Sequence, residues 1–134
     1  MTTDLLAATT EFVDAFTNQD LEKIMGFFHA DGVFCALDGT RSEGEENIKS
    51  AMEDILPIVE RFEEHDSFID AGQGDAGLGD SGQAKVVSEW TLYLNIKGKK
   101  YAWDGLDIIH WQDGKIVLKS TYAKTEKPRT IASP

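Results

Sequence analysis

The sequence predicts an α+β fold in which helices pack against one face of a curved antiparallel sheet. Apolar residues recur at helical spacing through much of the first half of the chain. The second half contains three long segments in which large apolar residues alternate with polar ones, and each junction is a two-residue glycine turn. Helices first and a meander of strands second is the order typical of α+β domains.

Capping residues and apolar stripes predict the helices. The stretch TTDLLAATTEFVDAFTNQDLEKIMGFFHADG predicts a helix, a break and a second helix. Thr3 or Asp4 is a plausible N-cap of the first helix, and Asp20 of the second. A third helix is predicted for EENIKSAMEDILPIV, which Pro57 should end or kink.

The predicted strands are two short segments and three long ones. DGVFCAL and ERFEEHDSFIDA are the short ones, and GQGDAGLGDSGQ is a glycine-rich connection that we expect to be flexible. AKVVSEWTLYLNI, KKYAWDGLDIIHW and KIVLKSTYAK are the long strands. We expect one domain over residues 1–134, with a loose C-terminal tail from about residue 125.

The turns at Lys97-Gly98 and Asp113-Gly114 fix a register in which residues directly opposite each other share a face of the sheet. One predicted face meets the helices, and Asp107 is its only charged residue. Its neighbours on that face include Ser88, Trp90, Trp103, Trp111, Ser120 and Tyr122. The other, outer face carries Tyr93, Leu106, Ile108 and Val117 among charged residues, more apolar surface than solvent contact requires.

Composition excludes several classes of function. The formal net charge of -11 argues against nucleic acid and anionic membrane surfaces as partners. No apolar run reaches the ~20 residues of a membrane span. MTTDLLAATTEF lacks the basic region and apolar block of a signal peptide, so we expect a cytoplasmic protein.

Neither a metal nor an organic cofactor is expected. Cys35 is the single cysteine, and His29, His65 and His110 have no ligand spacing around them. His65 is a weak candidate for a base, if its strand turns it toward a pocket, and otherwise a solvated or structural residue.

The chain resembles the SnoaL-like branch of the nuclear transport factor 2-like superfamily. FVDAFTNQDLEKIMGFFHADGVF is similar to the opening helices of that branch, and GLDIIHWQDGKIVLKSTYAK to its closing hairpin. The resemblance implies a cone-shaped barrel of curved sheet, three helices on its concave face, a pocket between them and a homodimer. Ketosteroid isomerases, polyketide cyclases, epoxide hydrolases, dehydratases and plain binding proteins share this fold.

The resemblance also locates candidate site residues. Asp107 matches the protonated aspartate of the ketosteroid isomerases, whereas their tyrosine and general base fall on Phe12 and Leu37. The acid of the polyketide cyclases would fall near Thr121, where no carboxylate occurs, and the meander lacks the arginine of the epoxide hydrolases.

Three functions remain open from the sequence. The first is a cofactor-independent isomerase, cyclase or dehydratase that uses Asp107 as acid or hydrogen-bond donor, with Tyr122 as a second donor. The second is a non-catalytic protein for a small, mostly apolar or cyclic ligand, and the third is a dimeric interaction protein with a vestigial pocket. Burial should favour the neutral form of Asp107, unless it only bonds Ser88 or Ser120 within a packed core. The residues expected to contact the ligand are Phe12, Phe16, Ser88, Trp90, Trp103, Trp111 and Ser120.

Overall fold

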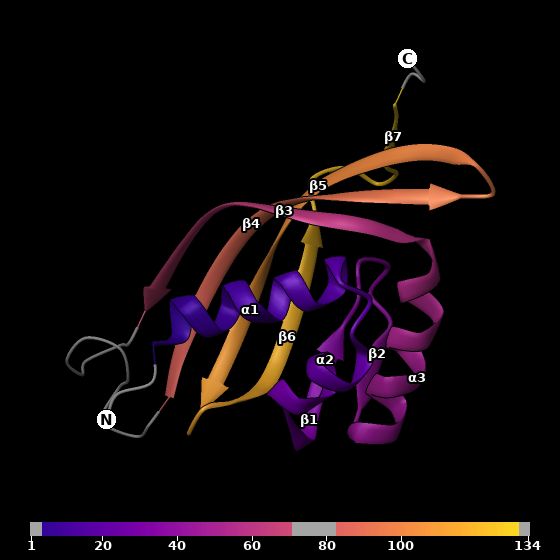
Figure 1. Cartoon of the computed structure of the whole chain (residues 1–134). Helices are drawn as coiled ribbons and strands as arrows, with labels where there is room; N and C mark the ends of the chain where they lie inside the picture. The colour runs from indigo at the N-terminus through magenta and orange to yellow at the C-terminus, as the bar shows by residue number, and fades with distance from the viewer. Residues whose placement is uncertain (1–3, 71–82, 132–134) are drawn as a thin grey trace.

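Three helices lie on one side of a curved, open, seven-stranded sheet in the computed structural model, which describes residues 4–70 and 83–131 (Figure 1). The predicted α+β fold is confirmed. In chain order the elements are α1 (Leu5–Thr17), α2 (Leu21–Phe27), β1 (Phe28–Cys35), β2 (Arg41–Glu43), α3 (Glu45–Ile55), the 3₁₀ turn η1 (Leu56–Ile58), β3 (Val59–Asp70), β4 (Gln83–Ile96), β5 (Lys99–Gln112), β6 (Lys115–Ala123) and β7 (Arg129–Thr130). Nearly all of the predicted flexible connection, residues 72–83, lies outside the described ranges.

The strand order is β2-β1-β6-β5-β4-β3, and β7 pairs with the end of β5 that extends past β6. Neighbouring strands are antiparallel except β1 and β6, which run parallel. In Figure 1, α1 runs across the sheet while α3 stands beside β1 and β2. The space between these helices and the sheet is where a cavity forms. None of the helices in the described ranges is long and apolar enough to cross a bilayer.

Local signals set the helix boundaries as the sequence predicts. The carboxylate of Asp4 accepts a hydrogen bond from the Ala7 backbone N–H at 3.1 Å, and Asp20 caps α2 through Lys23 in the same way. Thr3, the alternative cap, lies outside the described residues. Each bond satisfies a backbone donor that a helix N-terminus leaves free. Pro57 lies in η1, where α3 gives way to β3.

Both two-residue turns have the positive φ angles of the tight turns that suit hairpins. The φ values are 53° and 85° at Lys97-Gly98, and 51° and 82° at Asp113-Gly114. The β4–β5 ladder that follows is the predicted one along its whole length, with Ser88 opposite Asp107. The predicted register of this hairpin is therefore confirmed.

The β5–β6 ladder departs from the prediction after its first pairs. Trp111 pairs with Ile116 as expected, but His110 pairs with Leu118, so Val117 forms a bulge. Because side chains alternate along a strand, one extra residue turns every later side chain to the opposite face.

Lys119 and Thr121 consequently share the face of Asp107, which pairs with Thr121. Ser120 and Tyr122 were predicted there, and this prediction is wrong. Ser120 pairs with Ile108 on the outer face, and the Tyr122 residue is 53% exposed.

The segment after β6 makes hydrogen bonds to β5. The Ile131 backbone N–H donates to the Lys100 carbonyl at 3.0 Å, and Trp103 Nε1 donates to the Thr125 carbonyl at 2.8 Å. The end of β5 that β6 leaves unpaired thus provides bonding groups for β7. The loose tail expected from about residue 125 remains a prediction.

Candidate functional site

Asp107 is held by three donors on the helix-facing side of the sheet. Trp90 Nε1 donates to Asp107 Oδ2 at 3.0 Å. Lys119 Nζ and Thr121 Oγ1 donate to Oδ1 at 3.0 and 2.6 Å. Asp107 is 1% exposed, and all three contacts use its oxygens as acceptors. Its partners are therefore neither Ser88 nor Ser120, and the contacts do not support a donor role for this carboxyl group.

Lys119 is the cation that makes this acid tolerable in the core. The side chains of Lys119 and Asp107 are 5% and 2% exposed. A buried charge without a partner costs several kcal/mol, and a paired, hydrogen-bonded one much less. The Lys119 ammonium also donates to Thr121 Oγ1 at 2.8 Å and lies 4.8 Å from the ring centroid of Phe34 and 5.8 Å from that of Phe16.

A cavity of about 390 Å³ lies between α1, α3 and the sheet. Its walls are mostly apolar, and its volume is in the range of small-molecule sites. Lys119 and Thr121 form part of its wall, whereas Asp107 does not line it. The lining residues are Phe16, Phe34, Ala36, Leu37, Asp38, Thr40, Ser42, Ala51, Asp54, Ile55, Ile58, Phe62, Trp90, Leu92, Leu94, Trp103, Lys119 and Thr121.

The polar groups that Lys119 and Thr121 contribute to the cavity wall have almost no hydrogen-bonding capacity left. A lysine ammonium has three N–H groups, and two of those on Lys119 donate to Asp107 and Thr121. Thr121 donates its only hydroxyl hydrogen to Asp107. Within the described residues, one N–H of Lys119 and one lone pair of Thr121 are left for a molecule in the cavity.

Two exposed carboxylates belong to the lining as well. Asp38 accepts from the Thr40 backbone N–H at 2.9 Å. This hydrogen bond, with the Thr40 side chain second, lowers the pKa of Asp38 below its usual value. Asp54 contributes the second carboxylate, from α3. Both residues are exposed, so the accessible part of the cavity carries negative charge.

The structure brings together only some of the predicted ligand contacts. Phe16, Trp90 and Trp103 line the cavity. Phe12 and Trp111 are fully buried in the core and do not line it. Phe12 packs edge-on against the rings of its neighbours, with a centroid distance of 5.2 Å to Phe16. The Trp111 Nε1–H has no hydrogen-bond partner within the described residues.

Ser88 and Gly105 are close to Asp107 and Trp90 but do not line the cavity. Ser88 is buried and donates to Glu64 Oε2 at 2.6 Å. Gly105 lies opposite Trp90 in the ladder, and a Cβ at this position would collide with the Tyr122 backbone carbonyl oxygen and come within 2.7 Å of the indole Cη2. The missing side chain of Gly105 thus leaves room for the Trp90 ring that bonds Asp107.

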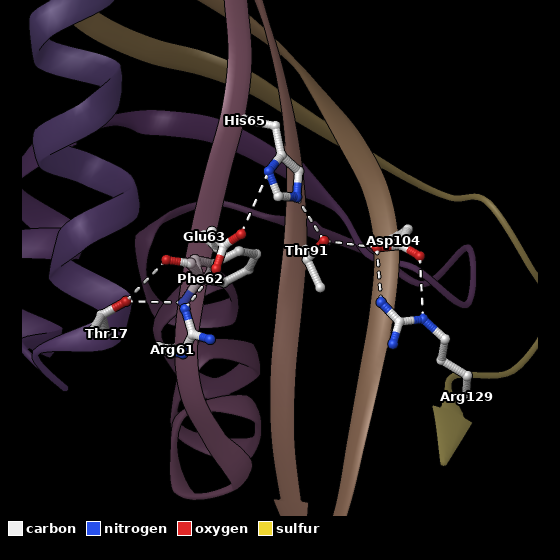
Figure 2. A network of polar contacts seen from close by, with 8 residues as sticks. All are labelled: Thr17, Arg61, Phe62, Glu63, His65, Thr91, Asp104 and Arg129. Carbon is white, nitrogen blue, oxygen red and sulfur yellow. Dashed lines mark hydrogen bonds and ion pairs between the residues drawn. The ribbon is translucent and has the colours of Figure 1, made fainter. Parts of the chain in front are cut away.

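His65 does not line this cavity, and Figure 2 shows its ring directed toward Thr91. Its Nε2 lies 2.7 Å from Thr91 Oγ1, and that hydroxyl donates to Asp104 Oδ1 at 2.7 Å. Since the hydroxyl has a single hydrogen, His65 Nε2 is the donor to Thr91. The Thr91 bond, followed by Arg129 from β7, lowers the pKa of Asp104. His65 and Tyr122 both line a second cavity, of about 380 Å³, on the outer side of the sheet. The condition for His65 to act as a base in the helix-side pocket is therefore not met.

Lys119 is the functional candidate that sequence reasoning missed. Strict alternation from the Asp113-Gly114 turn places Lys119 on the outer face, and the bulge at Val117 turns it inward. A usable signal was present nonetheless, because an acid predicted in the core requires a cation beside it. In the described ranges, no group of three or more histidine, cysteine or carboxylate residues is placed to hold a metal.

The chain belongs to the SnoaL-like domain family, whose model matches residues 9–119. No curated protein matches the sequence. Similar solved structures share the fold at low identity. A hypothetical protein from Catenulispora acidiphila with a ketosteroid isomerase-like fold, in complex with trimethylamine, is 18% identical (TM-score 0.67, 85% of this chain and 82% of that one). A steroid delta-isomerase from Pseudomonas aeruginosa is 19% identical (TM-score 0.67, 92% and 82%). An NTF-2 like protein of unknown function from Burkholderia xenovorans is 15% identical (TM-score 0.66, 98% and 88%). At these identities the likeness shows the NTF2-like fold alone.

Proposed function

We propose that this protein binds a small, mostly apolar molecule in the helix-side cavity, with an acceptor oxygen of that molecule against Lys119. The observation that carries the proposal is that Lys119 is buried, lines an apolar cavity of about 390 Å³ and has one N–H left to donate. Pockets of this kind fix a ligand by burying its apolar body and orienting it with a few polar groups.

The charges around the cavity disfavour an anionic ligand. Lys119 and Asp107 together carry no net charge, and Asp38 and Asp54 add negative charge to the wall. A ligand carboxylate would have to enter beside these acids, whereas a ketone or hydroxyl oxygen accepts the Lys119 N–H without adding charge. Ring ketones and alcohols are therefore the class we propose.

Asp107 has a positioning role in this proposal. It fixes the Lys119 ammonium and does not line the cavity itself. An isomerase, cyclase or dehydratase reaction that used Asp107 would have to move its proton through Lys119 or Thr121. The contacts support binding more directly than they support catalysis by Asp107. That the protein acts without a metal or cofactor, and in the cytoplasm, remains a prediction.

Calorimetry with a matched pair of compounds tests the proposal. We expect 1-tetralone to bind and tetralin, which lacks the oxygen, to bind about 10-fold or more weakly, since a hydrogen bond to a charged donor contributes about 1.5–3 kcal/mol. Ala51→Phe, which fills the cavity from α3, should abolish both interactions. Lys124→Met, at an exposed position, is the matched control and should change neither. If neither compound binds, or Ala51→Phe leaves binding unchanged, the cavity is not the site.

We further propose that two copies of the chain associate through the outer sheet face. Phe68 and Tyr122 are 57% and 53% exposed there. Phe68 is opposite Val87 on β4, which in turn is opposite Ile108 on β5. Leu106 is opposite Tyr122. Contiguous exposed apolar side chains of this kind are typical of an interface.

Light scattering at micromolar concentration tests the association. Leu106→Glu should shift a dimer toward the monomer mass, because a carboxylate cannot be buried there without a partner. Lys127→Glu, at an exposed position in the segment before β7, serves as the control and should keep the dimer mass. A wild-type protein that is monomeric, or a Leu106→Glu variant of unchanged mass, would contradict the proposal.

A further inference from the structure

Besides donating hydrogen bonds, the Lys119 amine can in principle react as a nucleophile. Among the described residues it is the only buried lysine, and it lies on the wall of an apolar cavity. Lysines in such surroundings serve in other proteins as amine nucleophiles toward carbonyl groups. We propose that Lys119 captures small apolar aldehydes or ketones as a covalent imine, an inference that rests on the proposed ligand cavity.

The proton that must leave Lys119 has an acceptor in place. Attack on a carbonyl carbon needs a neutral amine, and Asp107 Oδ1 lies 3.0 Å from Lys119 Nζ. Thr121 Oγ1 bonds both groups, at 2.6 Å to Asp107 and 2.8 Å to Lys119. These three side chains therefore form a closed set in which a proton can pass from nitrogen to oxygen without solvent.

The reaction balances within this set. The Lys119 ammonium gives one proton to Asp107, and the freed nitrogen lone pair forms a bond to the carbonyl carbon. The carbonyl π electrons move to oxygen, which takes a proton from the Thr121 hydroxyl on the cavity wall, while Thr121 takes the proton from Asp107. The resulting protonated carbinolamine passes a second nitrogen proton through Asp107 and Thr121 to its hydroxyl group. The nitrogen lone pair then forms the C=N bond as the C–O bond breaks and water leaves. One ammonium and one carbonyl thus yield one iminium and one water, with no oxidant or reductant.

The product fits the same surroundings as the reactant. An iminium keeps the positive charge and one N–H, which can still donate to Asp107. The aromatic rings of Phe34 and Phe16 lie 4.8 and 5.8 Å from the nitrogen and favour a cation there. Because the pair stays neutral overall, capture adds no net charge to a buried site.

The remaining described lysines lack this combination. Lys97 and Lys127 are exposed, and Lys100 pairs with Glu60 on the surface. Exposed lysines of this kind are strongly hydrated ammonium groups. They therefore provide an internal reference, within one sample, for nonspecific reaction with aldehydes.

Reductive trapping tests the inference on the whole protein. The protein is incubated with cyclohexanecarbaldehyde and sodium cyanoborohydride, and the modified lysines are identified by peptide mass spectrometry. We expect adduct at Lys119 to form on the order of tenfold faster than at Lys97 or Lys127, equivalent to about 1.4 kcal/mol in the barrier. Equal or slower modification of Lys119 would overturn the proposal.

Two variants and one further measurement separate the possible failures. Lys119→Arg keeps the cation but cannot form an imine, so it should lose the fast adduct. Ala51→Phe should slow trapping at Lys119 to the rate of the surface lysines by filling the cavity. Calorimetric binding of 1-tetralone with no preferential adduct would leave the proposed ligand cavity intact and refute the covalent step. Absence of both would refute both.

Discussion

Breaking the Asp107–Lys119 pair should cost more stability than any exposed lysine substitution. In Lys119→Met the carboxylate remains buried, at 2% side-chain exposure, with only Trp90 and Thr121 as donors. Removing one partner of a buried ion pair typically costs 3–5 kcal/mol. Because two donors remain, we expect the lower end, about 3 kcal/mol. For a urea slope of about 2 kcal/mol/M, the unfolding midpoint should fall by about 1.5 M.

A double-mutant cycle shows whether this cost comes from the pair itself. Asp107→Asn alone leaves Lys119 buried without its counter-ion and should cost a similar amount. The double variant Asp107→Asn/Lys119→Met removes both charges and should cost no more than either single change. The coupling energy should therefore be about 3 kcal/mol. Urea unfolding of the four proteins, with exposed Lys124→Met as a control, provides the measurement. Additivity of the two single changes to within about 0.5 kcal/mol would refute the reasoning.

Three further predictions concern residues around this centre and on the outer face. Gly105→Ala places a methyl group against the Tyr122 backbone carbonyl oxygen and the Trp90 indole ring, and should cost about 1–3 kcal/mol or more in urea unfolding. Gly26→Ala is the control, because Gly26 lies in α2 with open space around it, and this substitution should not be destabilising. An equal loss of stability in the Gly105→Ala and Gly26→Ala variants would count against the packing argument. Burial lowers the pKa of His110 below its usual 6.5, so only the unfolded chain takes up a proton just below that pH. The free energy of unfolding should therefore fall as the pH drops below 6.5, and His110→Gln should make this fall smaller. Urea unfolding midpoints of the two proteins at about pH 7 and about pH 5.5 measure the difference. Thr91→Val removes the main cause of the lowered pKa of Asp104, so this pKa should rise toward its usual value, as carboxyl NMR can show. A carboxyl group whose pKa is lower in the folded protein adds stability above its unfolded pKa, and this stability is lost as the pH falls through the folded pKa. In Thr91→Val the folded pKa of Asp104 lies closer to the unfolded one, so its contribution to stability should be smaller.

The parts of the fold that follow from local signals are the parts that the sequence predicts well. Asp4 and Asp20 cap their helices because the capping bond involves residues only three positions apart. The β4–β5 register follows from Lys97-Gly98 because a two-residue turn aligns both strands at once. In these cases the information lies in neighbouring residues.

The register of β6 depends instead on contacts that are distant in the sequence. A bulge at Val117 leaves no clear pattern in KIVLKSTY, and β6 also pairs in parallel with β1, where the ladder shifts between Phe28 and Val33. A one-residue difference reversed the predicted positions of Ser120 and Tyr122 and concealed Lys119. Trp103 and Trp111 are both on the predicted face of the sheet, but Trp103 lines the cavity and Trp111 lies in the core. This difference likewise depends on where the helices leave space above the sheet.

The presence of an acid on an apolar strand is explained by its cation. Two well-packed apolar side chains in place of a buried ion pair often make a protein more stable, so Asp107 and Lys119 are poorly explained by stability alone. Lys119 is also the member of the pair that faces the cavity, while Asp107 lies behind it. An ammonium group alone would be too costly in that wall, and a carboxylate that compensates its charge from outside the cavity makes it tolerable. Under the proposed function, Asp107 would act on a ligand through Lys119, and substitutions of either residue should change ligand binding together with the stability of the fold.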